Sequence, residues 1–294
     1  MHDRRPLFAD ASLLAVAALW GFGFVPMKEA LSGGMTPMMH LLVRQLIAVA
    51  VVGAIALFSV KRQSIGRREL RTGLVLGALL VAGWVAQTVG LAYTTPAKSG
   101  FITGLNVAIV PFVFWLVARH TPGRLQIAGA FIAAAGLAVL SLRGDLTLSG
   151  GDLLTLLGSV LFACQIVGLG LAARRMPVVV LALTQLVVAA ALIVVVTPFV
   201  DPLRLPHAWQ PWAATAWVGF TSVGLCFIVQ AWAQRHTTSS HAAVILCFQG
   251  AFAGLFSVLL WGEQLTLRLV LGALLILAGV VISEVRTVAP AATS

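Results

Sequence analysis

Long apolar runs separated by short polar stretches fill the chain from residue 8 to residue 285. Each run is about 20 residues long, which is the length of an α-helix that crosses a bilayer. None alternates with the two-residue period of an outer-membrane barrel strand. The pattern therefore predicts an all-α polytopic membrane protein. The ten predicted spans are 8–31, 36–59, 72–93, 97–118, 124–142, 151–172, 177–199, 211–233, 240–261 and 267–285.

Composition agrees with this pattern and fixes the surroundings of the chain. Of its 294 residues, 60% are hydrophobic and 10% are charged, against about 25% charged in a soluble domain. The lipid bilayer is thus the expected environment, and the net charge of +10 is attributed to basic loops rather than to nucleic-acid binding. The first apolar run extends past Trp20 and Phe24, longer than a signal peptide, so we expect a retained helix.

The basic residues predict an orientation. If both termini are cytoplasmic, thirteen Lys and Arg residues fall on the cytoplasmic side and five on the other, with Arg44 inside a span. Positive residues are enriched in cytoplasmic loops. We therefore expect a multi-pass protein of the bacterial inner (plasma) membrane with both termini cytoplasmic.

The chain contains a weak internal repeat. Sliding it by 143 residues aligns Gln87 with Gln230 and Asn106 with Gln249. Five spans per half is an odd number, so the second copy must be inverted in the membrane, as in many secondary transporters. We predict two five-helix units, 1–145 and 146–294, around a central cavity. The same shift pairs Thr94 with Thr237, Thr95 with Thr238, Gly129 with Gly272 and Gly136 with Gly279, a shift of 142 pairs Asp10 with Asp152 and Trp20 with Phe162, and a shift of 140 pairs Gln45 with Gln185.

The fourth span carries a polar stripe. Ser99, Thr103 and Asn106 are four and three residues apart, so they share one face of what we predict to be a single helix over 94–116. Gly100 and Gly104 form a small-xxx-small pair that lets another helix come close. Asn106 falls near mid-membrane, where an amide needs a polar partner or water. It either lines a transport cavity or ties two helices together.

Arg44 is the most informative single residue. It lies about nine residues into the second span, where a guanidinium is costly. It could hold a substrate carboxylate through paired hydrogen bonds, or it could be a structural arginine that binds backbone carbonyls. His40 shares its helix face and is either a packed histidine or a polar group of the site.

Aromatic and amide side chains complete the candidate site. Trp20 and Phe24 share a face of the first span, and Trp84 lies one turn from Gln87 in the third. An aromatic wall with amides nearby suits a zwitterion that carries a ring or an aliphatic side chain, although each aromatic could equally pack against helices or lipid. The full set of predicted substrate-binding residues is Trp20, Phe24, His40, Arg44, Trp84, Gln87, Ser99, Thr103, Asn106, Gln165, Gln230 and Gln249.

Several stretches resemble the EamA-type drug/metabolite transporter superfamily. They are WGFGFVPMK from Trp20, LAYTTPAKSGFITGLNVAIVP from Leu91 and WGEQLTLRLVLGALLILAGVVIS from Trp261, together with the arginine of the second span. The resemblance implies ten helices in two inverted halves around a cavity. Within the superfamily, aromatic-amino-acid exporters of the YddG type are the nearest functional guide. The chain departs from the family pattern at His120. The family often has a glutamate at this position, as the second half of this chain has at Glu263.

Motifs for other chemistry are missing from the sequence. It has no GxSxG, HExxH or GxxxxGK[ST] motif and no Cys/His metal spacing, so we expect no enzyme activity, no cofactor and no metal. All nine acidic residues fall at span ends or in loops, and we hypothesise transport driven by the substrate gradient.

The leading prediction is a carrier that exports a small molecule, an amino acid above all and an aromatic one in particular, by alternating access. The alternatives are another organic solute (a drug-like cation, a nucleobase or a sugar derivative), an intramembrane enzyme, or a membrane scaffold. The oligomeric state, with a monomer among the options, stays open.

Overall fold

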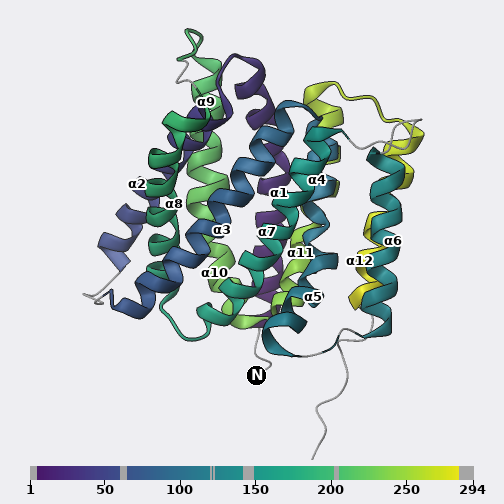
Figure 1. Ribbon diagram of the computed structural model, residues 1–294, viewed down its shortest axis with the longest axis horizontal. Helices are drawn as coiled ribbons and strands as arrows, with labels where there is room; N and C mark the ends of the chain where they lie inside the picture. The colour runs from purple at the N-terminus through teal and green to yellow at the C-terminus, as the bar shows by residue number, and fades with distance from the viewer. Residues whose placement is uncertain are drawn as a thin grey trace, which may run out of the picture.

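The computed structural model describes residues 5–59, 65–119, 121, 123–141, 149–201 and 205–284, and in this part of the chain every regular element is helical (Figure 1). The first half contains α1 (Arg5–Ser32), α2 (Pro37–Ser59), α3 (Arg67–Ala92), α4 (Pro96–Gly104), α5 (Asn106–Ala118) and α6 (Arg124–Ser141). The second half contains α7 (Gly150–Ala173), α8 (Val178–Val200), α9 (Gln210–Trp217), the π-helix η1 (Val218–Leu225), α10 (Cys226–His236), α11 (Ser239–Phe256), the π-helix η2 (Ser257–Trp261) and α12 (Leu267–Glu284).

Each of the ten predicted spans coincides with helical structure. In the described residues, eight continuous helical stretches are long and apolar enough to cross a membrane. The other two predicted spans are the shorter apolar helices α6 and α12, of 18 residues each, which pack against each other at one edge of the molecule (Figure 1). The predicted all-α membrane fold is thus confirmed. The predicted boundary between residues 145 and 146 lies outside the described residues.

The fourth span differs from its prediction. It is a single apolar stretch from Pro96 to Val117, but a turn at Leu105 divides it into α4 and α5. The amide of Leu105 donates to the carbonyl of Ile102 at 3.2 Å, and the amide of Ala108 donates to that of Leu105 at 3.0 Å. These bonds span three residues instead of four, so they tighten the backbone locally. The prediction of one uninterrupted helix was wrong for this reason.

The two halves use the same local devices. Thr95 caps α4 by accepting a hydrogen bond from the amide of Lys98 at 3.3 Å. Thr238, its predicted repeat partner, caps α11 by accepting one from the amide of His241 at 3.1 Å. Such caps satisfy amides at a helix start that have no helical partner. The repeat inferred from the sequence therefore reappears in the way the helices begin.

Helix packing across the halves is also reciprocal. A Cβ added to Gly77 of α3 would lie 2.7 Å from the carbonyl oxygen of Gln185 on α8. One added to Gly219 of η1 would lie 2.6 Å from the carbonyl oxygen of Arg44 on α2. In both cases glycine lets the third span of one half approach the second span of the other half. The halves are therefore interlocked rather than placed side by side.

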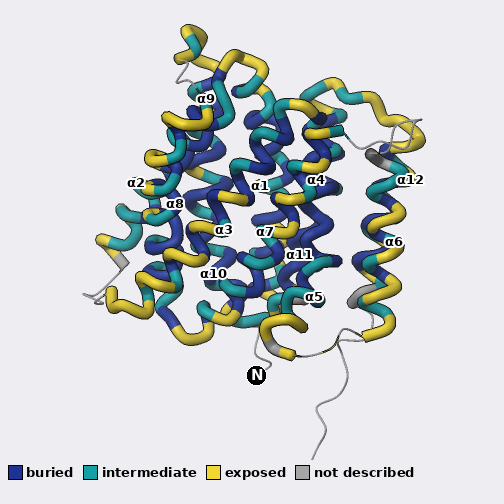
Figure 2. Tube along the Cα trace, in the orientation of Figure 1, coloured by how far each residue is buried: buried dark blue, intermediate teal, exposed yellow. Residues whose placement is uncertain are grey.

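Burial follows the same arrangement. Buried residues concentrate on the central helices, whereas exposed residues predominate on outer faces and at the ends of the helices (Figure 2). Many exposed side chains are large and apolar, as Phe58 and Leu116 are, which suits contact with lipid. As predicted, Gly100 and Gly104 provide a close approach, because α11 packs directly against them.

Candidate functional site

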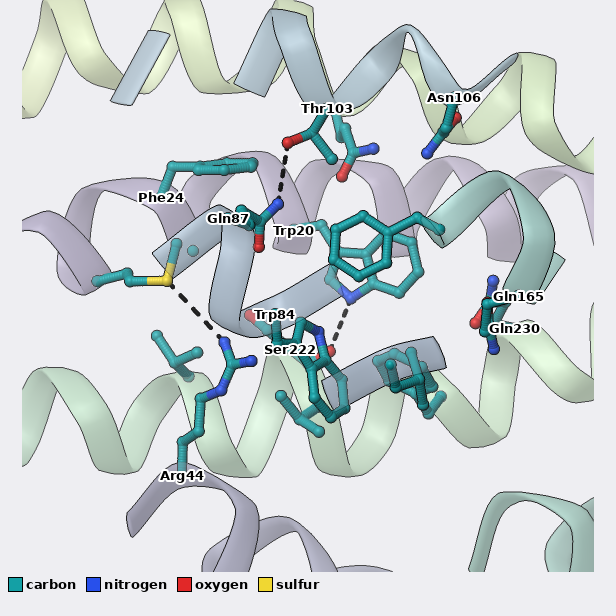
Figure 3. A pocket seen from close by; sticks show the side chains of 18 of the residues that line it. Trp20, Phe24, Arg44, Trp84, Gln87, Thr103, Asn106, Gln165, Ser222 and Gln230 are labelled. Atoms are coloured by element: carbon teal, nitrogen blue, oxygen red, sulfur yellow. Dashed lines mark hydrogen bonds between the residues drawn. The ribbon is translucent and has the colours of Figure 1, made fainter. Parts of the chain in front are cut away.

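A cavity lies between the two halves, in the middle of the helical bundle. About 630 Å³ of space in it is free of protein atoms, a figure that includes space open to the exterior. Helices α1 to α5 and the segments α7, η1, α10 and α11 all contribute to its wall. Ten of the twelve predicted site residues line it: Gln249, and the residues labelled in Figure 3 as Trp20, Phe24, Arg44, Trp84, Gln87, Thr103, Asn106, Gln165 and Gln230.

Arg44 projects from α2 into one end of this cavity. Its side chain is 3% exposed, and its Nη1 donates to the sulfur of Met27 at 3.9 Å. Its guanidinium carbon lies 4.8 Å from the ring centroid of Trp84, a cation–π contact that offsets part of the cost of burial. Within the described part of the chain, Nε and Nη2 have no hydrogen-bond partner, and no Asp or Glu lines the cavity.

Aromatic rings form the wall next to Arg44. The ring centroid of Phe227 lies 5.6 Å from that of Trp20 and 5.5 Å from that of Trp84. The indole nitrogen of Trp20 donates to the carbonyl of Ser222 in η1 at 2.7 Å, so its ring is held in place. The wall can therefore take up a flat apolar group without rearranging.

Two lining aromatics were missed from the sequence. Phe162 and Phe227 both face the cavity, yet neither was among the predicted site residues. The repeat held the signal, because Phe162 was already paired with Trp20, and the shift of 143 residues pairs Phe227 with Trp84. Symmetry could thus have extended the predicted aromatic wall to both halves.

Amide side chains supply most of the remaining polar groups. Gln87 donates through Nε2 to the hydroxyl of Thr103 at 2.9 Å, and Gln165 donates to Oε1 of Gln185 at 3.2 Å. Asn106 begins α5, directly after the turn at Leu105. The cavity therefore pairs one cation with neutral donors and acceptors.

His40 and Ser99 do not line the cavity. Nδ1 of His40 lies 2.9 Å from the hydroxyl oxygen of Thr215, so this side chain faces α9. Ser99 is completely buried one turn before Thr103. Both share a helix face with a lining residue, but the cavity does not extend to their level.

A second polar cluster closes the corner between α3 and α4. The hydroxyl of Thr94 donates to Asp152 at 2.8 Å, and that of Thr95 donates to Glu263 at 2.7 Å. Lys28 donates to the carbonyls of Leu91 and Ala92, at 2.8 and 3.1 Å. Both carboxylates come from the second half, so they join the halves at this end. His120, the counterpart of Glu263 in the first half, lies outside the described residues.

The cysteines behave as packing residues. Cys226 and Cys247 are buried and Cys164 is partly buried, and all three are free thiols. In the described residues, no cluster of three His, Cys, Asp or Glu side chains could hold a metal ion.

Two helical halves of membrane-spanning length, with a cavity between them, are typical of membrane transporters. The EamA-like transporter family matches residues 7–142 and again residues 149–284, so the chain belongs to this family. Similar proteins include an uncharacterized transporter of Archaeoglobus fulgidus, 32% identical over 96% of this chain and 87% of that protein. The uncharacterized transporter YoaV of Bacillus subtilis is 21% identical over 91% of this chain and 94% of its own.

A solved crystal structure shares the fold. It is 20% identical in sequence, superposes with a TM-score of 0.70, and the match covers 93% of this chain and 96% of that one. At this identity the likeness supports the architecture alone.

Proposed function

We propose that the protein exports a small carboxylate-bearing metabolite, an amino acid above all, by alternating access. The observation that carries this proposal is the buried guanidinium of Arg44, which faces the cavity with two unbonded nitrogens and, among the described residues, no carboxylate lining the cavity beside it. A buried cation without a counter-ion favours an anionic group of the substrate. A bound carboxylate would replace the water that Arg44 loses on burial.

The rest of the wall narrows the substrate class. Trp20, Trp84 and Phe227 form a rigid apolar surface beside Arg44, which favours a ring or a branched aliphatic chain next to the carboxylate. Aromatic amino acids, the substrates of YddG-type exporters, satisfy both requirements. A drug-like cation is disfavoured, because Arg44 would repel it.

Alternating access is supported by the inverted halves. Interlocked repeats can rock about a fixed central site and expose it to one side at a time. Among the described residues, no carboxylate lines the cavity that could couple transport to an ion. We therefore propose that the substrate gradient drives export across the inner membrane, with both termini on the cytoplasmic side.

Two alternatives remain open to the same test. A nucleobase or sugar derivative would use the amides and would not need Arg44. An intramembrane enzyme or a scaffold would move no solute.

Purified protein in liposomes, loaded with each labelled amino acid in turn, tests the proposal. For at least one amino acid, we expect efflux above that of loaded liposomes without protein. The efflux rate should fall about 100-fold in Arg44→Met, since a charged hydrogen bond contributes about 1.5–3 kcal/mol. Arg44→Lys should retain part of the rate. Arg175→Met, which removes an exposed arginine outside the cavity, is the matched control. Efflux that is unaffected by Arg44→Met would overturn the proposal.

A further inference from the structure

The two repeat-related glutamines of the cavity are not equivalent in their hydrogen bonding. Gln87 donates to Thr103. Gln230, its partner under the 143-residue shift, is 1% exposed, and among the described residues neither Nε2 nor Oε1 has a hydrogen-bond partner. Both side chains line the cavity. One glutamine of the pair is therefore bonded within its own half, whereas the other presents a free amide.

The sequence explains this asymmetry. The same shift that pairs the two glutamines pairs Thr103 with Leu246. Leu246 is completely buried in an apolar cluster with Leu13 and Val16, so the second half has no hydroxyl where the first half has one. Thr103, which accepts the hydrogen bond from Gln87, therefore has no hydroxyl counterpart in the second half.

A buried amide with two unbonded atoms calls for a partner from outside the protein. Native proteins leave few such groups unsatisfied, because burial removes the water that would bond them. Gln230 can accept a hydrogen bond through Oε1 and donate one through Nε2. A ligand with a neutral N–H or O–H group satisfies it.

The position of Gln230 indicates which part of the substrate it meets. Figure 3 shows Arg44 at one end of the cavity and Gln230, with Gln165 next to it, at the other. Phe227, which contacts both Trp20 and Trp84, lies on α10 one turn before Gln230. A substrate whose carboxylate binds Arg44 and whose ring lies on this aromatic wall would direct the far edge of the ring toward Gln230.

Resting on the function proposed above, we propose that Gln230 determines specificity. It hydrogen-bonds the polar atom on the ring of the substrate, so the carrier prefers aromatic amino acids with a ring N–H or O–H, as in tryptophan and tyrosine, over phenylalanine. Phenylalanine would bind Arg44 and the wall equally well but would leave the amide of Gln230 unbonded. A buried polar group left without its partner is a strong basis for discrimination.

Competition between the three amino acids in liposomes tests this inference. We expect the unmodified protein to favour tyrosine or tryptophan over phenylalanine by about tenfold or more in kcat/KM. In Gln230→Met, which keeps the length of the side chain and removes its hydrogen bonds, the ratio should fall toward one through a loss for tyrosine and tryptophan. Gln234→Met is the matched control. It alters the same residue type one turn further along α10, buried but outside the cavity lining, and should keep the ratio.

A second pair of variants acts on Gln230 without replacing it. Leu246→Thr restores the hydroxyl that the first half has at Thr103, and should lower the preference by occupying the amide. Leu246→Val introduces a side chain with the shape of threonine but without the hydroxyl, and it should leave the preference unchanged.

Equal transport of the three amino acids by the unmodified protein, or an unchanged ratio in Gln230→Met, overturns the specificity role. The carrier function stands in that case, provided that Arg44→Met still lowers efflux by about 100-fold. If none of the three is transported, the proposed aromatic substrates and this inference fail together.

Discussion

Gly136 and Gly279, which are 143 residues apart in the sequence, make the same contact from opposite sides. A Cβ on Gly136 of α6 would lie 2.7 Å from the amide nitrogen of Ile276 and 2.8 Å from the carbonyl oxygen of Gly272 on α12. A Cβ on Gly279 would lie 2.5 Å from the corresponding atoms of Ala133 and Gly129. The partners are themselves related by the same shift. The contact is therefore symmetric, and a local two-fold axis of the repeat runs between α6 and α12.

This contact predicts the effect of a single methyl group. Gly279→Ala should force α12 away from α6 and lower the stability of the purified protein by about 1–3 kcal/mol, seen as an earlier thermal unfolding transition in detergent. Gly53→Ala is the control, since a Cβ there has open space within 4 Å and alanine favours helix by up to about 1 kcal/mol. Equal melting temperatures for the two variants would contradict the close packing.

The proposed orientation can be tested at the two ends of α3. Ile65, just before α3, is 52% exposed and Tyr93, just after it, is 74% exposed. With both termini cytoplasmic, a cysteine at Tyr93 should react with a membrane-impermeant thiol reagent in intact cells. A cysteine at Ile65 should react only after permeabilisation. The measurement uses a background in which the three native cysteines are replaced, and the reverse labelling pattern would invert the topology.

Hydropathy and the repeat predicted most of the fold and many of the residues that line the cavity. Span length is set by the bilayer, so ten apolar runs predict ten helices. Residues that share a face at one depth then meet in the same cavity, as Gln87 and Thr103 do. The repeat also predicted that Asn106 and Gln249, which lie on different helices, meet at the same cavity.

The remaining features depend on tertiary neighbours. Helical spacing places His40 on the face of Arg44, but only the position of Thr215 shows that this ring turns toward α9. The turn at Leu105 depends on a change of hydrogen-bond register, which an apolar composition does not reveal. The free amide of Gln230 needed both the repeat and the bonding pattern of the structure.

Gly219 predicts a positioning effect on Arg44. Its Cβ would lie 2.6 Å from the carbonyl oxygen and 2.9 Å from Cα of Arg44, so Gly219→Ala should displace the guanidinium. We expect KM for the transported amino acid to rise about tenfold, since misplacement of a binding group by 1 Å can cost as much or more. Concentration dependence of uptake into liposomes measures this.

The control for Gly219 is Gly77, the glycine that makes the reciprocal close contact in the first half. Gly77→Ala makes an equivalent contact with Gln185 and Val188 and should lower stability to a similar extent without raising KM. If both variants change KM equally, the effect is general loosening of the packing and Arg44 has no special dependence on Gly219.

The hydrogen bond between Thr94 and Asp152, at the corner between α3 and α4, is expected to hold the cavity closed on that side. Thr94 donates to Asp152, which is 2% exposed, whereas at the opposite end of the molecule Asp10 binds His241 at 3.1 Å with both side chains partly exposed. A buried charged hydrogen bond contributes about 1.5–3 kcal/mol, so its loss shifts a two-state equilibrium by a factor of about ten or more. Thr94→Val and Asp152→Asn should therefore favour the state open at the end where α3 finishes.

Accessibility of a cavity residue measures this shift. Phe24→Cys, in the cysteine-free background, places a thiol in the cavity lining, and an impermeant reagent applied on the Tyr93 side should label it about tenfold faster once Asp152 is replaced by asparagine. Asp10→Asn removes the same charge at the other end and should not increase labelling from that side. Equal rates with and without Asp152 would show that the Thr94–Asp152 contact does not hold this side closed, whereas a selective increase would assign the two carboxylate contacts to opposite ends of the transport cycle.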